Sequence, residues 1–457
     1  MDSNTSELIA VLALYAAAGV PALIVYMKRR DPFDPRVFFP VFYAYVTSGV
    51  CLFSFFWSGE YHPGLKAEML IPVLLSCSTA ILGFSTGCTF ALYGKLGQIP
   101  GRRILHSVST TTQLISNRLV RNASCLASLV TISIYACISH YMQIQQAASG
   151  GIGKVDKLAC ADETTLRWFY LFAAVSTATL TLAVITDAFV SRRIFSPAIV
   201  ALLLADFLVC TYSGERDILL VGGIWCIANW PKLSRIQLIM FLIAIFGWFG
   251  ISSVLRTSGL GFGSQINAIN DVRVEDWFYS LTHFAPNVHV FTNVATEVPA
   301  VDEHWYGYSL LGAFASFIPG NFPLKDITPA NWFQDVYDMQ GASGFAFSQD
   351  AEAYLNFGWL GPPIWFAVWG YFLAVLYRKA IQPRAHLWNV FIWWFAVSVS
   401  LFGIRSDSRG IIKMFILGAI ASKILCVLAD AWAARTVREF PQRRFHPPVR
   451  HVPRTTS

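Results

Sequence analysis

The sequence predicts an all-α polytopic membrane protein with about 11 transmembrane helices, within a range of about 10 to 13. Hydrophobic residues make up 55% of the 457-residue chain, charged residues only 13%, and the mean hydropathy is +0.51. These values lie well outside the range of soluble globular proteins. The chain also holds a series of apolar runs close to the roughly 20 residues that a helix needs to cross about 30 Å of hydrocarbon.

The apolar runs fall in two groups, separated by one long polar segment. The first group lies within 1–254, at 7–27, 37–57, 69–94, 122–142, 168–190, 194–212, the short run 218–230, and 236–254; the second lies within 350–432, at 351–377, 388–404 and 411–432. Segment 255–349 is expected to be one large outer loop that contains short helices. Within it, 306–320 is too short for a comfortable span and is predicted to be interfacial or re-entrant. Residues 433–457 form a basic tail on a single integral membrane domain.

The distribution of Lys and Arg predicts the orientation of the chain. Translocation leaves basic loops in the cytoplasm, and the basic clusters of this chain all fall in one of the two alternating sets of loops. The amino terminus and the loop 255–349 are therefore expected outside, and the carboxyl terminus inside. The first run lacks a basic flank and a cleavage motif, so it is expected to be a retained span. The net charge of +7 is mostly this topology signal and does not indicate nucleic-acid binding.

Four arginines depart from that pattern, because they fall at the predicted outer membrane boundary: Arg216, Arg256, Arg405 and Arg409. A guanidinium group donates two parallel hydrogen bonds to a phosphate and stays ionised in partly dry surroundings. The four together predict a site for a lipid-linked pyrophosphate. The alternative is that each arginine reaches the lipid headgroups or pairs with a neighbouring carboxylate.

Two carboxylates, Asp350 and Glu352, stand where the chain re-enters the membrane. Carboxylates in this arrangement resemble the metal-and-base element of some membrane glycosyltransferases. The alternative is helix capping, because Ser348 followed by acidic residues is a favoured helix start. The histidines of the large loop, including His289, lack metal-ligand spacing and are interpreted mainly as surface residues.

Two stretches of sequence resemble one family. The run from Gly344 to Gly361 (GFAFSQDAEAYLNFGWLG) resembles the corresponding stretch of the oligosaccharide repeat-unit polymerases, the Wzy-type O-antigen polymerases. The run from Ser213 to Asp217 (SGERD) resembles the Arg-bearing turn of the same family, although many members have small neutral residues around the arginine. The resemblance covers about 200–410; before residue 200 it is one of hydropathy alone.

The resemblance implies a metal-independent glycosyltransferase of the GT-C type that needs no cofactor. Such an enzyme transfers a glycan from undecaprenyl pyrophosphate to the non-reducing end of another lipid-linked repeat unit, at the periplasmic face of the bacterial inner membrane. The amino terminus would then be periplasmic and the carboxyl terminus cytoplasmic. Membrane lipids, and the chain-length regulator and flippase of the same pathway, are the implied partners.

The expected mechanism assigns a role to each candidate residue. The four arginines neutralise the pyrophosphate as the glycosidic C–O bond breaks. A base takes the proton of the attacking sugar hydroxyl; the candidates, in order, are Glu352, Asp217, Asp350 and His289.

Other functions remain open at this stage. An O-antigen ligase has a similar architecture and donor but passes the glycan to a lipid core, and cell-wall-type polymerases place their loop differently. From a different class, a lipid-linked oligosaccharide flippase or other transporter is also polytopic. A transporter predicts inverted repeats and broken helices at mid-membrane, and the sequence contains no evident repeat of this kind. A non-catalytic scaffold is a further alternative.

Overall fold

The computed structural model describes residues 3–53, 65–93, 111–149, 160–191, 194, 196–213, 218–229, 232–234, 236–237, 239–241, 243–244, 247, 287–318, 323–325, 327–336, 347–382, 385–404 and 406–439. These residues form helices and turns, with no strand among them. The first half of the chain contains α1 (Ser3–Arg29), α2 (Pro35–Phe53), η2 (Ala67–Met69), α3 (Leu70–Leu92), α4 (Thr111–Ser149), α6 (Glu163–Val190), α7 (Pro197–Ser213) and α8 (Ile218–Asn229).

The second half begins with short elements and ends with long helices. The short elements are α12 (Asn287–Glu297), α13 (Tyr308–Ala315), η4 (Pro323–Lys325), α14 (Pro329–Val336), α15 (Gln349–Phe357) and η5 (Gly358–Leu360). The long helices are α16 (Gly361–Ala380), α17 (Leu387–Gly403) and α18 (Ser408–Glu439). Because α13 has only eight residues, at 1.5 Å per residue it is far too short to cross hydrocarbon.

The protein is an all-α membrane protein. Six helical stretches in the described part of the chain are long and apolar enough to cross a membrane: Ser6–Arg29, Ala67–Leu92, Ser116–Ala148, Thr164–Val190, Gln349–Ala380 and Ser408–Arg435. The shorter apolar helices Pro197–Ser213 and Leu387–Leu401 overlap two more of the expected runs, 194–212 and 388–404. Most of the expected run 236–254 lies outside the described residues, so the total of 11 stays a prediction.

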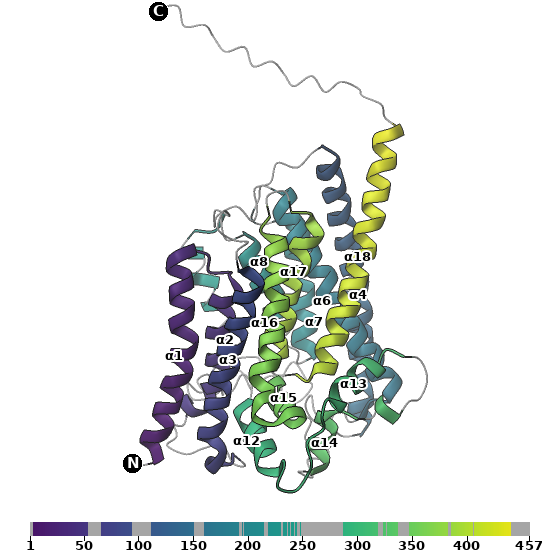
Figure 1. The fold of residues 1–457 in the computed structure, drawn as a ribbon. Helices are drawn as coiled ribbons and strands as arrows, with labels where there is room; N and C mark the ends of the chain where they lie inside the picture. Colours follow the sequence, from purple (N-terminus) through teal and green to yellow (C-terminus); the bar gives the residue numbers. More distant parts are fainter. Residues whose placement is uncertain are drawn as a thin grey trace, which may run out of the picture.

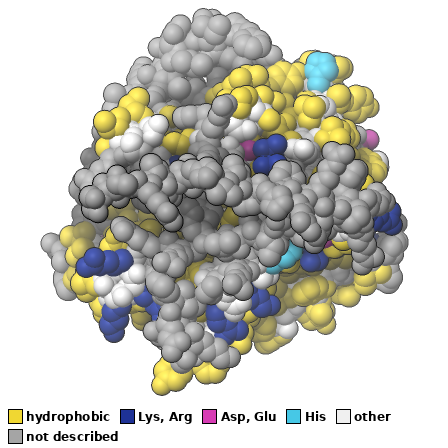
Figure 2. All heavy atoms as spheres, turned by 90° about the horizontal axis from the view of Figure 1, so that it is seen from above, with side chains coloured by type: hydrophobic (Ala, Val, Ile, Leu, Met, Phe, Trp, Pro, Cys, Tyr) yellow, Lys and Arg dark blue, Asp and Glu magenta, His cyan; other side chains and the backbone are white. Residues whose placement is uncertain are grey.

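The long helices pack into a bundle with two distinct ends (Figure 1). The amino terminus, α12 to α15 and the first turn of α18 lie at one end, which we call the loop end. The last turns of α1 and α18 lie at the other, which we call the tail end. The basic clusters in the last turns of α1 and α16 share the tail end. Figure 2 looks onto this end and shows Lys and Arg side chains in several places around it.

Glycines allow α3 and α16 to approach each other closely. A Cβ atom on Gly87 would lie 1.9 Å from the carbonyl oxygen of Ala367, and one on Gly83 would lie 2.2 Å from that of Pro363. Small residues at such positions let helix backbones come into contact in a membrane, where packing replaces the hydrophobic effect as the driving force. This contact fixes α16, and α15, which leads into α16 through η5, is fixed with it.

The segment 255–349 is not simply a polar loop outside the bundle, because its helix α12 is part of the core. Every side chain from Asn287 to Ala295 is buried. Several of these residues are polar, so hydropathy predicts that they are exposed. In the structure they form internal hydrogen bonds: Asn287 donates to the Ile404 carbonyl at 2.8 Å and Asn293 to the His289 carbonyl at 2.8 Å. The interpretation of the loop histidines as surface residues is therefore wrong for His289, which is 3% exposed.

Candidate site at the loop end

The short helix α15 carries both predicted carboxylates into the protein interior. Its side chains from Gln349 to Asn356 are all buried. The Ser348 side chain makes no capping hydrogen bond, so the alternative of a serine cap is not seen here. The helix ends at Phe357, and the next residue, Gly358, has a φ of +62° that suits glycine and turns the chain toward α16. Positions 350 and 352 are about 200° apart around a helix, so their side chains leave α15 on different sides.

Asp350 faces α2 and α3. Its Oδ2 atom accepts a hydrogen bond from the Tyr43 hydroxyl at 2.7 Å and one from the Cys77 thiol at 3.6 Å. The side chain is 1% exposed. A buried carboxylate needs such donors, because burial without them costs several kcal/mol. Asp350 therefore fastens α15 to the first helices of the chain.

Glu352 faces α18 instead. Its two carboxylate oxygens accept hydrogen bonds from the Ser408 backbone amide and the Ser408 hydroxyl, each at 2.6 Å. Both residues are buried, with Glu352 3% and Ser408 1% exposed. Ser408 is the first residue of α18, where backbone amides lack partners within the helix and the helix dipole favours a negative charge. Glu352 thus caps α18 from a different helix.

Asp407 completes the start of α18 and lies beside Glu352. Its Oδ1 atom accepts from the Gly410 amide at 3.0 Å, the standard arrangement of an N-cap residue. The negative charges of Asp407 and Glu352 repel each other. The Asp407 side chain keeps some exposure, but loss of hydration raises the pKa of its carboxyl group above the ordinary value, against the opposite effects of the Gly410 amide and nearby cations.

Basic side chains lie near Asp407, the nearest of them Arg409 and Lys413 of the same helix. Arg409 donates from Nη1 to the Lys325 carbonyl in η4 at 2.7 Å. Lys413 follows Arg409 at the i, i+4 spacing that places two side chains on one face of a helix. Arg409, Arg167 of α6 and Lys325 all repel the Lys413 ammonium, whereas Asp407 attracts it. We call Arg167, Lys325, Arg409 and Lys413 the basic group.

The structure describes only some of the predicted site residues. Arg216, Asp217, Arg256 and Arg405 lie outside the described residues. Arg409 lies in the basic group, Glu352 lies beside it, and Asp350 contacts different helices. His289 is buried in α12, which packs against α2, α3 and α15.

Sequence reasoning missed the other members of this site. One signal was available, because Lys413 stands one helical turn after Arg409. Arg167, Lys325 and Ser408 carry no such signal, since only the fold brings α6, η4, α15 and α18 together. In the described part of the chain, no three His, Cys, Asp or Glu side chains are grouped so as to bind a metal ion.

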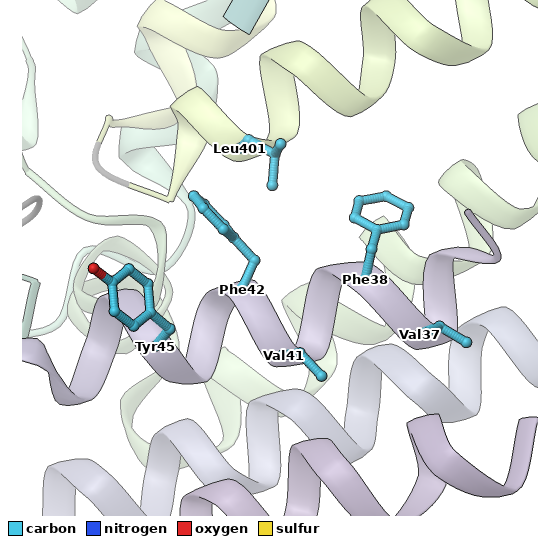
Figure 3. A pocket seen from close by; sticks show the side chains of 6 residues that line it. All are labelled: Val37, Phe38, Val41, Phe42, Tyr45 and Leu401. Atoms are coloured by element: carbon cyan, nitrogen blue, oxygen red, sulfur yellow. The ribbon is translucent and has the colours of Figure 1, made fainter. Parts of the chain in front are cut away.

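An apolar groove lies elsewhere, between α2 and α17 (Figure 3). Its volume is about 510 Å³, and it is lined by Val37, Phe38, Val41, Phe42, Tyr45 and Leu401. Phe38, Phe42 and Leu401 point into the space between the two helices. None of the lining residues is charged, and the Tyr45 hydroxyl is the polar side-chain group among them.

Comparisons of this chain with models of known protein families, with curated proteins and with solved structures find no match.

Proposed function

We propose that this protein is a membrane-embedded glycosyltransferase of the repeat-unit polymerase type. It transfers a glycan from undecaprenyl pyrophosphate to the non-reducing end of a second lipid-linked repeat unit. One observation carries the proposal: Asp407, which neighbours Glu352 in a carboxylate pair, lies close to Arg409 and Lys413 at the start of α18. A base next to a cluster of cations is what transfer from a pyrophosphate donor requires.

In the proposed reaction, a hydroxyl oxygen of the acceptor sugar attacks the anomeric carbon of the donor. The bond between that carbon and the pyrophosphate oxygen breaks, and the lipid pyrophosphate leaves with the electron pair. Arg409 neutralises the charge that develops on the leaving group, together with Arg216, Arg256 and Arg405. The acceptor proton passes to the carboxylate pair.

The two carboxylates have different proposed parts in this step. Both oxygens of Glu352 are engaged by Ser408, so Glu352 positions the first turn of α18 and the arginine that it carries. Asp407 keeps some exposure and is the member of the pair that meets the acceptor. Asp350 holds α15 through Tyr43 and acts structurally, while Asp217 and His289 stay candidate bases from the sequence.

The proposed orientation places the loop end in the periplasm and the tail end in the cytoplasm of a bacterial inner membrane. The basic clusters in the last turns of α1 and α16 support it, because such clusters stay on the cytoplasmic side. Lipid-linked glycans are then presented at the end that holds the carboxylate pair and the basic group.

The test is to reconstitute the purified protein in liposomes with lipid-linked repeat units. Polymer ladders on a gel are the expected result. Glycan transfer that occurs only after a lipid-core acceptor is added would indicate a ligase instead. Movement of the lipid-linked unit across the bilayer without any new glycosidic bond would indicate a transporter.

A further inference from the structure

The membrane helix α4 buries polar side chains and exposes apolar ones. Its exposed side carries Leu126, Leu129 and Ile144, which are 64%, 52% and 54% exposed. Its buried side carries six polar residues that follow one another at steps of three or four, the spacing that keeps side chains on one side of a helix. These residues, which we call the polar seam, are Ser124, Ser128, Thr131, Tyr135, Ser139 and Gln143, and none is more than 9% exposed.

The polar seam is about as long as the hydrocarbon layer of a membrane is thick. At about 1.5 Å per residue, the distance from Ser124 to Gln143 is about 28 Å, against about 30 Å for the hydrocarbon. Small residues such as serine help membrane helices to pack closely. Tyr135 and Gln143 are large, however, and burying their polar groups costs free energy unless these groups are hydrogen-bonded. Close packing therefore does not explain the whole seam.

Side chains of α6 and α7 meet the polar seam. The three helices pack against one another and lie side by side in Figure 1. The Thr131 hydroxyl lies 3.4 Å from the Thr179 hydroxyl of α6, and the Ser139 hydroxyl lies 2.8 Å from the Ser213 hydroxyl of α7. A hydroxyl group both donates and accepts hydrogen bonds. Such contacts can therefore pass a proton from one group to the next.

A buried carboxylic acid side chain, Asp206, lies on the side of α7 that meets α4. Asp206 is 5% exposed and stands seven residues before Ser213, which is about two turns of helix. Both α4 and α7 run from the tail end to the loop end. Asp206 therefore lies opposite the part of α4 between Thr131 and Tyr135. Acidic side chains inside a membrane are rare and often belong to proton or ion paths.

Titratable groups stand at both ends of the polar seam. At the tail end, the Ser124 hydroxyl donates to the Arg121 carbonyl at 3.0 Å, and the Arg121 guanidinium lies 3.6 Å from the Asp187 carboxylate of α6. At the loop end, Nδ1 of the exposed His140 lies 2.7 Å from the Tyr212 hydroxyl. These groups can exchange protons with water on the two sides of the membrane.

A hydroxyl of α6 provides a second, independent observation. The Ser176 side chain is 2% exposed, and its hydroxyl has no hydrogen-bond partner among the described residues. Ser176 stands three residues before Thr179, so it lies on the side of α6 that meets α4. A buried polar group without a partner costs about 1–3 kcal/mol. Buried water commonly satisfies such groups.

We propose that the polar seam, together with Asp206 and Ser176, forms a path for protons across the membrane. Protons move between hydroxyl groups and bound water by exchange of hydrogen bonds, which needs no open channel. Hydroxyl contacts of 2.8 and 3.4 Å leave no passage for a hydrated metal ion. The Asp206 carboxylate binds a proton that arrives from one end and releases it toward the other, and no other bond forms or breaks. This path is independent of the proposed function.

The test measures proton flux without any glycan substrate. The purified full-length protein is reconstituted in liposomes that contain K⁺ and a pH-sensitive dye, and valinomycin is added so that the outward flow of K⁺ makes the inside negative. The rate of internal acidification is then compared with that of protein-free liposomes. Asp206→Asn removes the group that binds and releases the proton, and Thr131→Val replaces a hydroxyl with a methyl group of the same size. Thr86→Val is the matched control, because Thr86 is exposed on α3 and donates to the Leu82 carbonyl of its own helix at 2.7 Å.

The unaltered protein is expected to acidify the liposomes faster than the protein-free background. Asp206→Asn should reduce the flux to that background, Thr131→Val should reduce it by about tenfold, and Thr86→Val should leave it unchanged. Gel filtration shows whether each variant is folded, and Thr131→Val, which keeps the shape of the side chain, decides the matter if Asp206→Asn does not fold. A flux no faster than the background would overturn the proposal, as would an unchanged flux in either folded test variant or an equal loss in Thr86→Val.

The outcome separates this path from the proposed function. Proton flux that depends on Thr131, in a protein that forms no polymer from lipid-linked repeat units, would keep the path and reject the polymerase. Polymer ladders from a protein whose proton flux equals that of protein-free liposomes would keep the polymerase and reject the path.

Discussion

The contact between Glu352 and Ser408 gives a prediction whose size follows from the structure. Two hydrogen bonds of 2.6 Å join the residues, a length typical of bonds to an ionised carboxylate. Hydrogen bonds to charged groups contribute about 1.5–3 kcal/mol each. Ser408→Ala removes the hydroxyl bond and keeps the amide bond, so we expect it to lower the free energy of unfolding by about 1.5–3 kcal/mol.

Glu352→Gln tests the same contact from the other side. The glutamine oxygen still accepts from the Ser408 amide, and its NH₂ group donates to the Ser408 hydroxyl, so both bonds persist without the charge. Neutral bonds contribute about 1 kcal/mol less apiece than charged ones, which gives an expected loss of about 2 kcal/mol. The double variant loses less than the sum of the two, because each single change already weakens the shared bond.

The assay is equilibrium unfolding of the protein and its three variants in mixed micelles. Ser133→Ala is the control, because Ser133 is exposed and donates to the Leu129 carbonyl of its own helix at 2.8 Å; it should change the free energy by less than about 0.5 kcal/mol. The expected coupling between Glu352 and Ser408 is at least about 1 kcal/mol. If the losses in the free energy of unfolding caused by Glu352→Gln and Ser408→Ala add to the loss of the double variant within about 0.3–0.5 kcal/mol, the contact is refuted. The positioning of α18 by α15 is then refuted with it.

Three further predictions concern the same framework. Gly87→Ala forces α3 and α16 apart, because its Cβ atom would lie 1.9 Å from a carbonyl oxygen, and should lower the free energy of unfolding by about 1–3 kcal/mol. Gly19→Ala is the control: its Cβ atom would have nothing within 4 Å, and the loss should be less than about 0.5 kcal/mol. Equal losses in the two variants would contradict the packing of α3 against α16. Tyr43→Phe leaves the Asp350 carboxylate without its hydroxyl donor and should lower the free energy of unfolding by about 1.5–3 kcal/mol. A loss under about 0.5 kcal/mol would contradict the conclusion that Asp350 links α15 to α2. Folding raises the pKa of Asp407, so the contribution of this residue to the free energy of unfolding is largest below its unfolded pKa of about 4 and is lost as the pH rises through the folded pKa. Asp407→Asn should therefore gain stability relative to the unaltered protein between acid and neutral pH. A stability difference that stays constant across that pH range would contradict the prediction.

The sequence was a good guide to the helices because their signal is local. Runs such as 69–94 and 168–190 correspond closely to α3 and α6, since an apolar run of the right length has few alternatives in a membrane. The same rule failed at α12. Its polar residues look like those of a solvated loop, and only the hydrogen bonds that they make on burial, such as Asn287 to Ile404, explain why they lie in the core.

The candidate site could be predicted only in part, because its contacts are long-range. The sequence analysis identified Asp350, Glu352 and Arg409 as candidates, but it expected Asp350 and Glu352 to act together at one place. Their partners stand 307 residues away for Asp350 and 56 for Glu352, and no spacing rule links residues so far apart. The contribution of Arg167 and Lys325 to the basic group depends on how α6 and η4 pack and has no local signature.

The role of the loop-end site in bond formation is tested most directly by one comparison in liposomes supplied with lipid-linked repeat units. Arg409→Lys keeps the positive charge but loses the planar fork, and Lys423→Arg is the control on the same helix, at a side chain that lies 5.0 Å from the Trp388 ring. We expect polymer formation to fall about 10²-fold or more in the first variant, as for loss of one group that stabilises developing charge, and to be unchanged in the second. Full-length glycan ladders from Arg409→Lys at the rate of the unaltered protein would contradict the proposed site.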